Sequence, residues 1–143
     1  MDFVTHLLLG FLFLGLDPWV FLGSLLPDFI YIIATIRVMD YEAAHSLRIW
    51  AWGERLHSIF IPIPILGLSM FLPFKELRLF SLAYIFHIIL DIISHRNRGP
   101  RYFWPIYDKF VLKGLFNWNI KTFLLTYSFI ITCVVVQFYL HIF

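Results

Sequence analysis

The segment LRLFSLAYIFHIILDIIS, residues 77–94, decides the fold class of this chain. Most of its residues are aliphatic or aromatic, and it contains neither glycine nor proline. A helix that crosses a bilayer needs about 20 mostly apolar residues, with a range of about 17–25. Residues 77–94 are therefore predicted to cross a membrane as one helix.

The composition of the whole chain agrees with this prediction. Of the 143 residues, 61% are hydrophobic, 20% are aromatic and 14% are charged. A soluble domain carries about 25% charged and about 45–50% apolar residues. The composition excludes a soluble fold, and it also excludes disorder, which needs low hydrophobicity and high charge. The net charge of +2 does not suggest nucleic-acid binding. We expect one integral membrane domain spanning residues 1–143.

Further crossings are predicted on both sides of this segment. Residues 122–143 form a long apolar run at the C-terminal end, and residues 58–74 form a shorter run that contains three prolines. Residues 3–16 and 19–36 are predicted to form a helical hairpin, whose second arm is interrupted near mid-membrane at Leu26-Pro27-Asp28. The expected fold is all-α: a multi-pass bundle with about five membrane segments and a broken N-terminal hairpin.

The basic residues predict how this bundle is oriented. Five crossings place segments 37–57 and 95–121 on one face of the membrane. These two segments hold nine of the eleven basic residues: Arg37, Arg48, Arg55, Arg96, Arg98, Arg101, Lys109, Lys113 and Lys121. Lys75 and Arg78 fall on the other face. The positive-inside rule therefore predicts the cytoplasmic membrane, with the N-terminus on the cytoplasmic side.

Ionisable residues inside the apolar segments are the exceptions that point to function, because each costs about 2.5–3.5 kcal/mol at the centre of a spanning helix. His87, Asp91 and His95 are spaced four residues apart, so they line one face of one helix. The five-crossing topology brings three more such groups to a similar depth: His6, Asp28 and His57. We expect these side chains to meet in one pocket near the cytoplasmic interface.

The charge of this set favours a divalent metal ion. Two buried carboxylates with neutral histidines carry two negative charges, and bare anions in hydrocarbon are strongly unfavourable. Histidine nitrogen with aspartate oxygen suits zinc best, although manganese and iron also fit. Such a site with an open position activates water near neutral pH, which is hydrolase chemistry. The alternative is that the histidines are packing residues and that Asp28 caps a half-helix.

Five short blocks of sequence resemble a known family, the membrane-bound metal-dependent hydrolases. This family includes the YdjM-like, LexA-regulated inner-membrane proteins and is related to zinc-dependent phospholipase C-like proteins. The blocks lie within residues 1–105, and their polar positions are His6, Asp28, His57, His87 and Asp91. They are Thr5-His6-Leu7-Leu8, Gly23-Ser24-Leu25-Leu26-Pro27-Asp28, Leu56-His57-Ser58, His87-x-x-x-Asp91 and Arg101-Tyr102-Phe103-Trp104-Pro105. The resemblance implies a multi-pass helical protein, a divalent metal and hydrolase activity, with a phosphoester lipid as the suggested substrate.

The chain also departs from that family pattern. Many relatives have a second Asp-His directly after Leu-Pro-Asp, where this chain has Phe29, Ile30 and Tyr31. Many relatives also have His-Arg-Gly before the third block, where this chain reads Gly-Glu-Arg-Leu over residues 53–56. These departures argue against a second metal ion and leave His95 as a candidate extra ligand.

The sequence therefore supports a membrane-embedded metal hydrolase as its leading hypothesis, with Asp28 and His57 as the catalytic residues. Arginines at the same rim are candidates for holding a phosphate, or they face anionic lipid headgroups. They are Arg55, Arg96, Arg98 and Arg101. The alternatives are a metal-binding or ion-conducting membrane protein without turnover, a b-type haem protein, and a structural partner protein.

Overall fold

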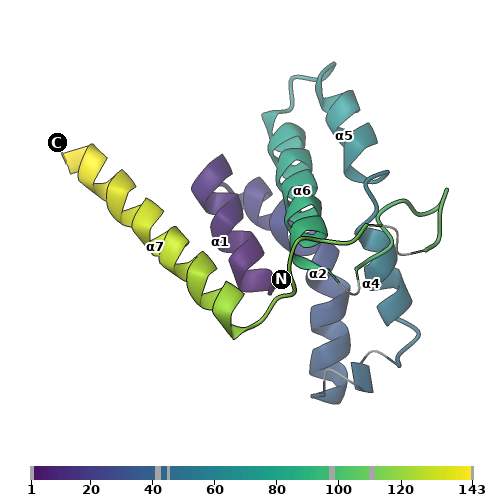
Figure 1. The fold of residues 1–143 in the computed structure, drawn as a ribbon. Coiled ribbons are helices and arrows are strands. Elements are labelled where there is room, and N and C mark those ends of the chain that lie inside the picture. Colours follow the sequence, from purple (N-terminus) through teal and green to yellow (C-terminus); the bar gives the residue numbers. More distant parts are fainter. Residues whose placement is uncertain (1, 41–42, 45, 97–98, 110–111, 143) are drawn as a thin grey trace.

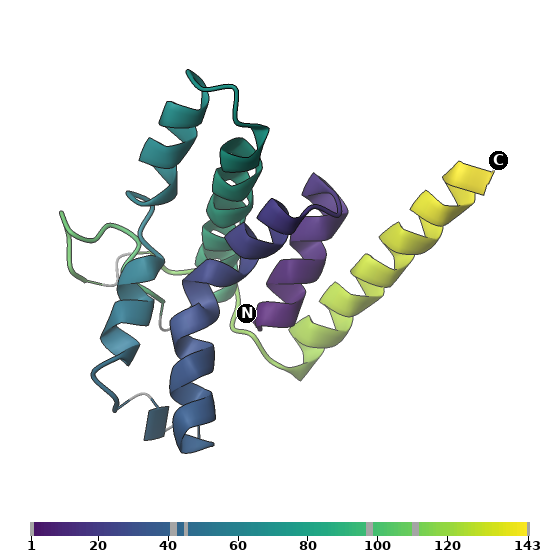
Figure 2. The same ribbon diagram turned by 180° about the vertical axis from the view of Figure 1, so that it is seen from behind.

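The computed structural model describes residues 2–40, 43–44, 46–96, 99–109 and 112–142. Its regular elements within these ranges are α-helices, which confirms the all-α prediction. Figures 1 and 2 show the helices gathered around α6, with α7 set apart at one side. The helices are α1 (Phe3–Leu14), α2 (Pro18–Val38), α4 (Trp50–Leu56), α5 (Pro62–Ser69), α6 (Lys75–Ser94) and α7 (Ile120–Ile142).

Local capping signals form the N-terminal hairpin of α1 and α2. The Asp2 carboxylate accepts hydrogen bonds from the Thr5 backbone N–H (2.9 Å) and the Thr5 hydroxyl (2.8 Å), which satisfies free donors at the start of α1. Gly15 ends α1 with φ of +93°, a conformation that side chains disfavour. Asp17 then caps α2 by accepting from the Trp19 N–H at 2.8 Å. The chain therefore turns between the two predicted arms, residues 3–16 and 19–36, at Asp17-Pro18.

The predicted interruption at Pro27 is a bend and not a break. α2 continues through Pro27 to Val38 as one helix, and Figure 2 shows it changing direction partway along its length. Proline has no N–H and crowds the carbonyl four residues earlier, which here belongs to Gly23. The chain remains helical, but the backbone hydrogen bond from residue 27 to the Gly23 carbonyl is missing in the turn that precedes Asp28.

α2 and α6 form the most extensive helix–helix contact of the fold. Gly23 makes this close approach possible, because a Cβ at that position would lie 2.3 Å from the Phe80 carbonyl oxygen and 2.9 Å from Ala83 Cβ. α1 packs on α2 and α6, α4 packs on α2, and α5 packs on α6. α7 contacts α1 and exposes most of its apolar surface.

Three of the helices are long and apolar enough to cross a membrane: α2, α6 and α7. The predicted spans over residues 77–94 and 122–143 correspond to α6 and α7. α1 has 12 residues and α5 has 8, which is shorter than the roughly 20 residues that a crossing needs. The lengths support a membrane protein, while the count of about five membrane segments is not confirmed.

Residues 54–59 lie against residues 101–104 of the segment that follows α6. The Ile59 N–H donates to the Tyr102 carbonyl at 2.9 Å, and the Arg101 N–H donates to the Glu54 carbonyl at 3.3 Å. The Ser58 hydroxyl donates to the Trp104 carbonyl. Figure 1 shows that the start of α1 and the end of α6 lie near one another, at the end of the bundle where α4 also lies.

Candidate metal centre

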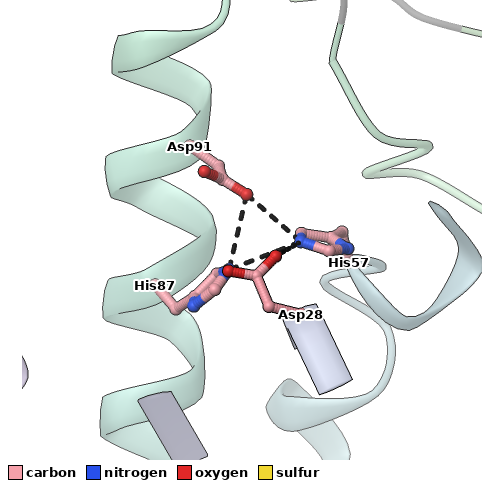
Figure 3. Close-up of side chains that lie close together, drawn as sticks. All are labelled: Asp28, His57, His87 and Asp91. Carbon is pink, nitrogen blue, oxygen red and sulfur yellow. Dashed lines mark hydrogen bonds and ion pairs between the residues drawn. The ribbon is translucent and has the colours of Figure 1, made fainter. Parts of the chain in front are cut away.

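Four side chains from three separate parts of the chain meet beside α6. His87 and Asp91 lie one turn apart on α6, Asp28 comes from α2, and His57 follows the last residue of α4. One ligand atom from each residue lies within 4.8 Å of the other three, and Figure 3 shows all four pointing toward one another. This buried Asp/His cluster can hold a metal ion.

The distances among His57 Nε2, His87 Nε2 and Asp91 Oδ2 match one triangular face of a tetrahedral site, with Asp28 next to it. His57 Nε2 lies 3.4 Å from His87 Nε2. Asp91 Oδ2 lies 3.2 Å from His57 Nε2 and 3.4 Å from His87 Nε2. Asp28 Oδ1 lies 3.4 Å from His57 Nε2, and its Oδ2 lies 3.9 Å from His87 Nε2. Zinc–nitrogen bonds of about 2.0–2.1 Å at tetrahedral angles place neighbouring ligand atoms about 3.3 Å apart.

The outer nitrogens of two histidines show which way their lone pairs face. His57 Nδ1 donates to the Gly53 carbonyl at 2.8 Å, and His87 Nδ1 donates to the Ser24 carbonyl at 2.7 Å. A carbonyl only accepts, so each Nδ1 carries the hydrogen, and each neutral ring presents a lone pair at Nε2. When both rings are neutral, these two lone pairs face each other at 3.4 Å, and a metal ion between them or a proton on one ring removes the repulsion. Histidine ligands of metals commonly have this arrangement, with the outer N–H on a carbonyl.

The other two predicted ligands contact the same cluster from a different side. His6 Nε2 and His95 Nε2 lie 3.0 Å and 3.2 Å from Asp91 Oδ1. The His6 ring stacks on the His87 ring with centroids 3.8 Å apart, and His6 Nδ1 lies 3.5 Å from Asp28 Oδ2. The structure therefore brings together all six residues that were predicted as metal ligands, with four in the tight cluster and two beside Asp91.

Burial makes a compensating charge necessary. The side chains of His6, His57 and His87 are 0% exposed and that of Asp91 is 3% exposed. The side chains of Asp28 and His95 reach the surface, at 13% and 33% exposure. Two carboxylates among neutral imidazoles carry two negative charges that a divalent cation balances. Asp28 and His95 are thus the members of the set with side-chain surface outside the buried part of the cluster.

Three supporting groups were not found from the sequence: the carbonyls of Ser24 and Gly53, and the Tyr31 ring. The Tyr31 ring stacks on His57 at 5.3 Å and on Trp50 at 4.3 Å, so it fixes the plane of the imidazole. A backbone carbonyl exists at every residue, so nothing in the sequence marks the two that act here.

The arginines predicted to hold a substrate have different surroundings. Arg55 places its guanidinium 4.9 Å from the Trp52 ring centre and 5.6 Å from that of Trp104. Arg101 Nε donates to Glu54 at 2.7 Å and Arg101 Nη1 to Asp108 at 2.5 Å. The hydrogen bond with Asp108, followed by that with Glu54, raises the pKa of Arg101.

Arg101 is therefore balanced by two carboxylates, whereas Arg55 lies against aromatic rings. Arg96 is exposed just beyond the end of α6, and its backbone N–H donates to the Phe116 carbonyl at 3.2 Å. Arg98 lies outside the described residues. Of the three candidate substrate-binding arginines that the structure describes, Arg55 and Arg96 make no ion pair with a carboxylate of the described residues.

Comparisons of the chain with known protein families, with curated proteins and with solved structures find no match. The chemistry of the centre is therefore inferred from its residues and the distances between them.

Proposed function

We propose that this protein is a membrane-embedded metal-dependent hydrolase that acts on a lipid or phosphoester substrate at the cytoplasmic interface. His57, His87 and Asp91 hold the ion and leave a fourth position open for water beside Asp28, and their nitrogen and oxygen donors favour zinc. The observation that carries the proposal is the convergence of these side chains, with His57 Nε2 and His87 Nε2 3.4 Å apart and both rings fixed by carbonyls. The resemblance to membrane-bound metal-dependent hydrolases supports the same reaction class.

The residues divide the work of hydrolysis between them. A bound divalent ion supplies Lewis acidity that activates water near neutral pH. Asp28 is the most exposed of the four side chains, so its carboxylate is the group that accepts the proton of the attacking water. His57, held by Gly53 and Tyr31, keeps its Nε2 directed at the reacting centre.

Tyr102 is a candidate donor to the substrate. Its side chain is buried, and its hydroxyl makes no hydrogen bond with the described residues. Burial, followed by the nearby negative charge of Asp91, raises the pKa of Tyr102. The hydroxyl therefore keeps its proton at neutral pH and can donate it in a hydrogen bond to a substrate oxygen.

The membrane arrangement that accompanies this proposal has five segments. In this arrangement residues 3–16 and 58–74, which contain the short helices α1 and α5, are the crossings besides α2, α6 and α7. The cluster and nine of the eleven basic residues are then on the cytoplasmic side. Arg55, between two tryptophans, and Arg96 are then placed at the headgroup level, where an anionic lipid presents its phosphate. The N-terminus is cytoplasmic in this arrangement.

One observation favours a second candidate function, a metal-binding or ion-conducting protein without turnover. His57, His87 and Asp91 are almost completely buried, as in a site that retains an ion without admitting a substrate. Zinc-loaded protein that is inert toward a panel of phospholipids and soluble phosphoesters would favour this function over hydrolysis.

Replacing Asp91 with asparagine tests the proposed function. Asp91→Asn preserves the size of the side chain but removes the negative charge that lies next to both His57 and His87. We expect purified protein to lose its metal and, with it, turnover of a phosphoester lipid. The matched control is Asp17→Asn at the start of α2, which preserves the capping oxygen and lies outside the cluster. An Asp91→Asn protein with full metal content and full activity would contradict the proposal.

A further inference from the structure

The two oxygens of Asp91 face two different pairs of histidines. Oδ2 lies 3.2 Å from His57 Nε2 and 3.4 Å from His87 Nε2, within the tight cluster. Oδ1 lies 3.0 Å from His6 Nε2 and 3.2 Å from His95 Nε2. Each oxygen of this carboxylate therefore faces its own pair of histidine nitrogens. A carboxylate in this position can bridge two metal ions.

His6 lies between two carboxylates. Both of its ring nitrogens face carboxylate oxygens, Nε2 toward Asp91 at 3.0 Å and Nδ1 toward Asp28 at 3.5 Å. Neither nitrogen makes a hydrogen bond with the described residues, and the residue is 1% exposed. A neutral imidazole has a single N–H, so one of its lone pairs faces an anion. A proton or a metal ion at Nε2 removes this repulsion, and a metal ion there leaves Nδ1–H directed at Asp28, which is the common carboxylate–histidine–metal arrangement.

His95 is held in place by its backbone. Its N–H donates to the Asp91 carbonyl at 3.0 Å, and its own carbonyl accepts from the Gly114 N–H at 3.1 Å. Gly114 packs so closely that a Cβ there would lie 2.4 Å from the Ile92 carbonyl oxygen. The His95 side chain is 33% exposed, so this side of Asp91 opens toward the surface.

We propose a second divalent-cation site formed by His6 Nε2, His95 Nε2 and Asp91 Oδ1, with Asp91 bridging the two ions. This inference rests on the proposed metal centre and reverses the expectation of a single ion. Carboxylate-bridged pairs hold their ions about 3.5–4 Å apart and clamp both the attacking and the leaving oxygen of a phosphoester.

The second ion also narrows the substrate class. One dication neutralises Asp28 and Asp91, whereas two dications leave a net charge of two positive units in the centre. A buried positive charge requires an anion. The paired site therefore selects an anionic phosphoester over a neutral ester, and it receives that substrate on the exposed His95 side.

Counting zinc ions tests this second site separately from the first. Detergent-purified protein is dialysed to equilibrium against zinc, and zinc per chain is measured by mass spectrometry. We expect two ions in the wild type and in Asp17→Asn, and one ion in His95→Ala and in His6→Ala. Zinc X-ray absorption should show zinc–zinc scattering at about 3.5–4 Å in the wild type and none in His95→Ala.

Two results would overturn the second site. A wild type that saturates at one ion, with His95→Ala equal to it, removes the second site and leaves the proposed hydrolase centre standing. Two ions in both His95→Ala and His6→Ala reject these residues as ligands. A wild type that binds no zinc removes both proposals.

Discussion

The position of the His57 ring depends on a residue that has no side chain. Gly53 accepts the hydrogen bond from His57 Nδ1 at 2.8 Å and packs flat against Tyr31. Tyr31 in turn stacks on His57 with ring centres 5.3 Å apart. A change at Gly53 therefore acts on a metal ligand through both the carbonyl and the ring.

Gly53→Ala should weaken metal binding without removing any ligand. The new Cβ would lie 2.4 Å from Tyr31 Cε1, so the Tyr31 ring must move and the His57 ring moves with it. Disturbing the groups that orient metal ligands typically costs about 10–100-fold in affinity. Zinc affinity measured by competition with a chelator checks this expectation.

Gly67→Ala is the matched control, because a Cβ there meets nothing within 4 Å. It replaces a helical glycine in α5 and should leave zinc affinity unchanged. Equal zinc affinity in the two variants would show that Gly53 does not position His57.

At the scale of the element, the contact between α2 and α6 sets the width of the site, because Asp28 lies on one helix and His87 on the other. Gly23→Ala should force these helices apart, since its Cβ would lie 2.3 Å from the Phe80 carbonyl oxygen. Overpacking of this kind costs about 1–3 kcal/mol in the free energy of unfolding. Thermal unfolding in detergent should show a lower Tm, and an unchanged Tm beside Gly67→Ala would reject this packing account.

Helical spacing allowed part of the site to be predicted from sequence. His87 and Asp91 are four residues apart on an apolar helix, so they had to share a face. Bringing His6, Asp28 and His57 to that face required the order of the helices, which the apolar runs supplied. The division of the Asp91 oxygens between two histidine pairs depends on side-chain torsions, which no spacing encodes.

The elements that differed from expectation contain proline or lie in polar segments. Pro27 was expected to break a helix, but the packing of α2 on α6 maintains its path as a bend. α4 (Trp50–Leu56) was not expected, because it lies in a segment that contains arginine and tryptophan. Residues 58–74 were expected to form one crossing, but the helix that they contain is the short α5, which begins at Pro62.

At the scale of the whole molecule, the metal centre joins α2, α4 and α6, so a bound ion should stabilise the fold. A ligand that binds only the folded state at a concentration 100 times its Kd adds about 2.7 kcal/mol. Chelation of the wild type should therefore lower its Tm, and added zinc should restore it. Asp91→Asn should not respond to either treatment. A wild-type Tm that is insensitive to chelator would contradict a structural link between the ion and the fold.

The proposed orientation is also testable on the whole chain. Cys133 is the single cysteine, so Cys133→Ser provides a background without thiols. In that background, Ser46→Cys should react with a membrane-impermeant maleimide only from the cytoplasmic side, and Lys75→Cys only from the opposite side. Both positions are exposed in the structure. Labelling of both from one side would contradict the proposed orientation.

The most direct measurement of the central claim is an experimental structure of zinc-loaded protein with anomalous scattering collected at the zinc edge. The account predicts a peak between His57 Nε2 and His87 Nε2, about 2.0–2.1 Å from each. An empty position between these nitrogens in zinc-saturated protein would contradict it.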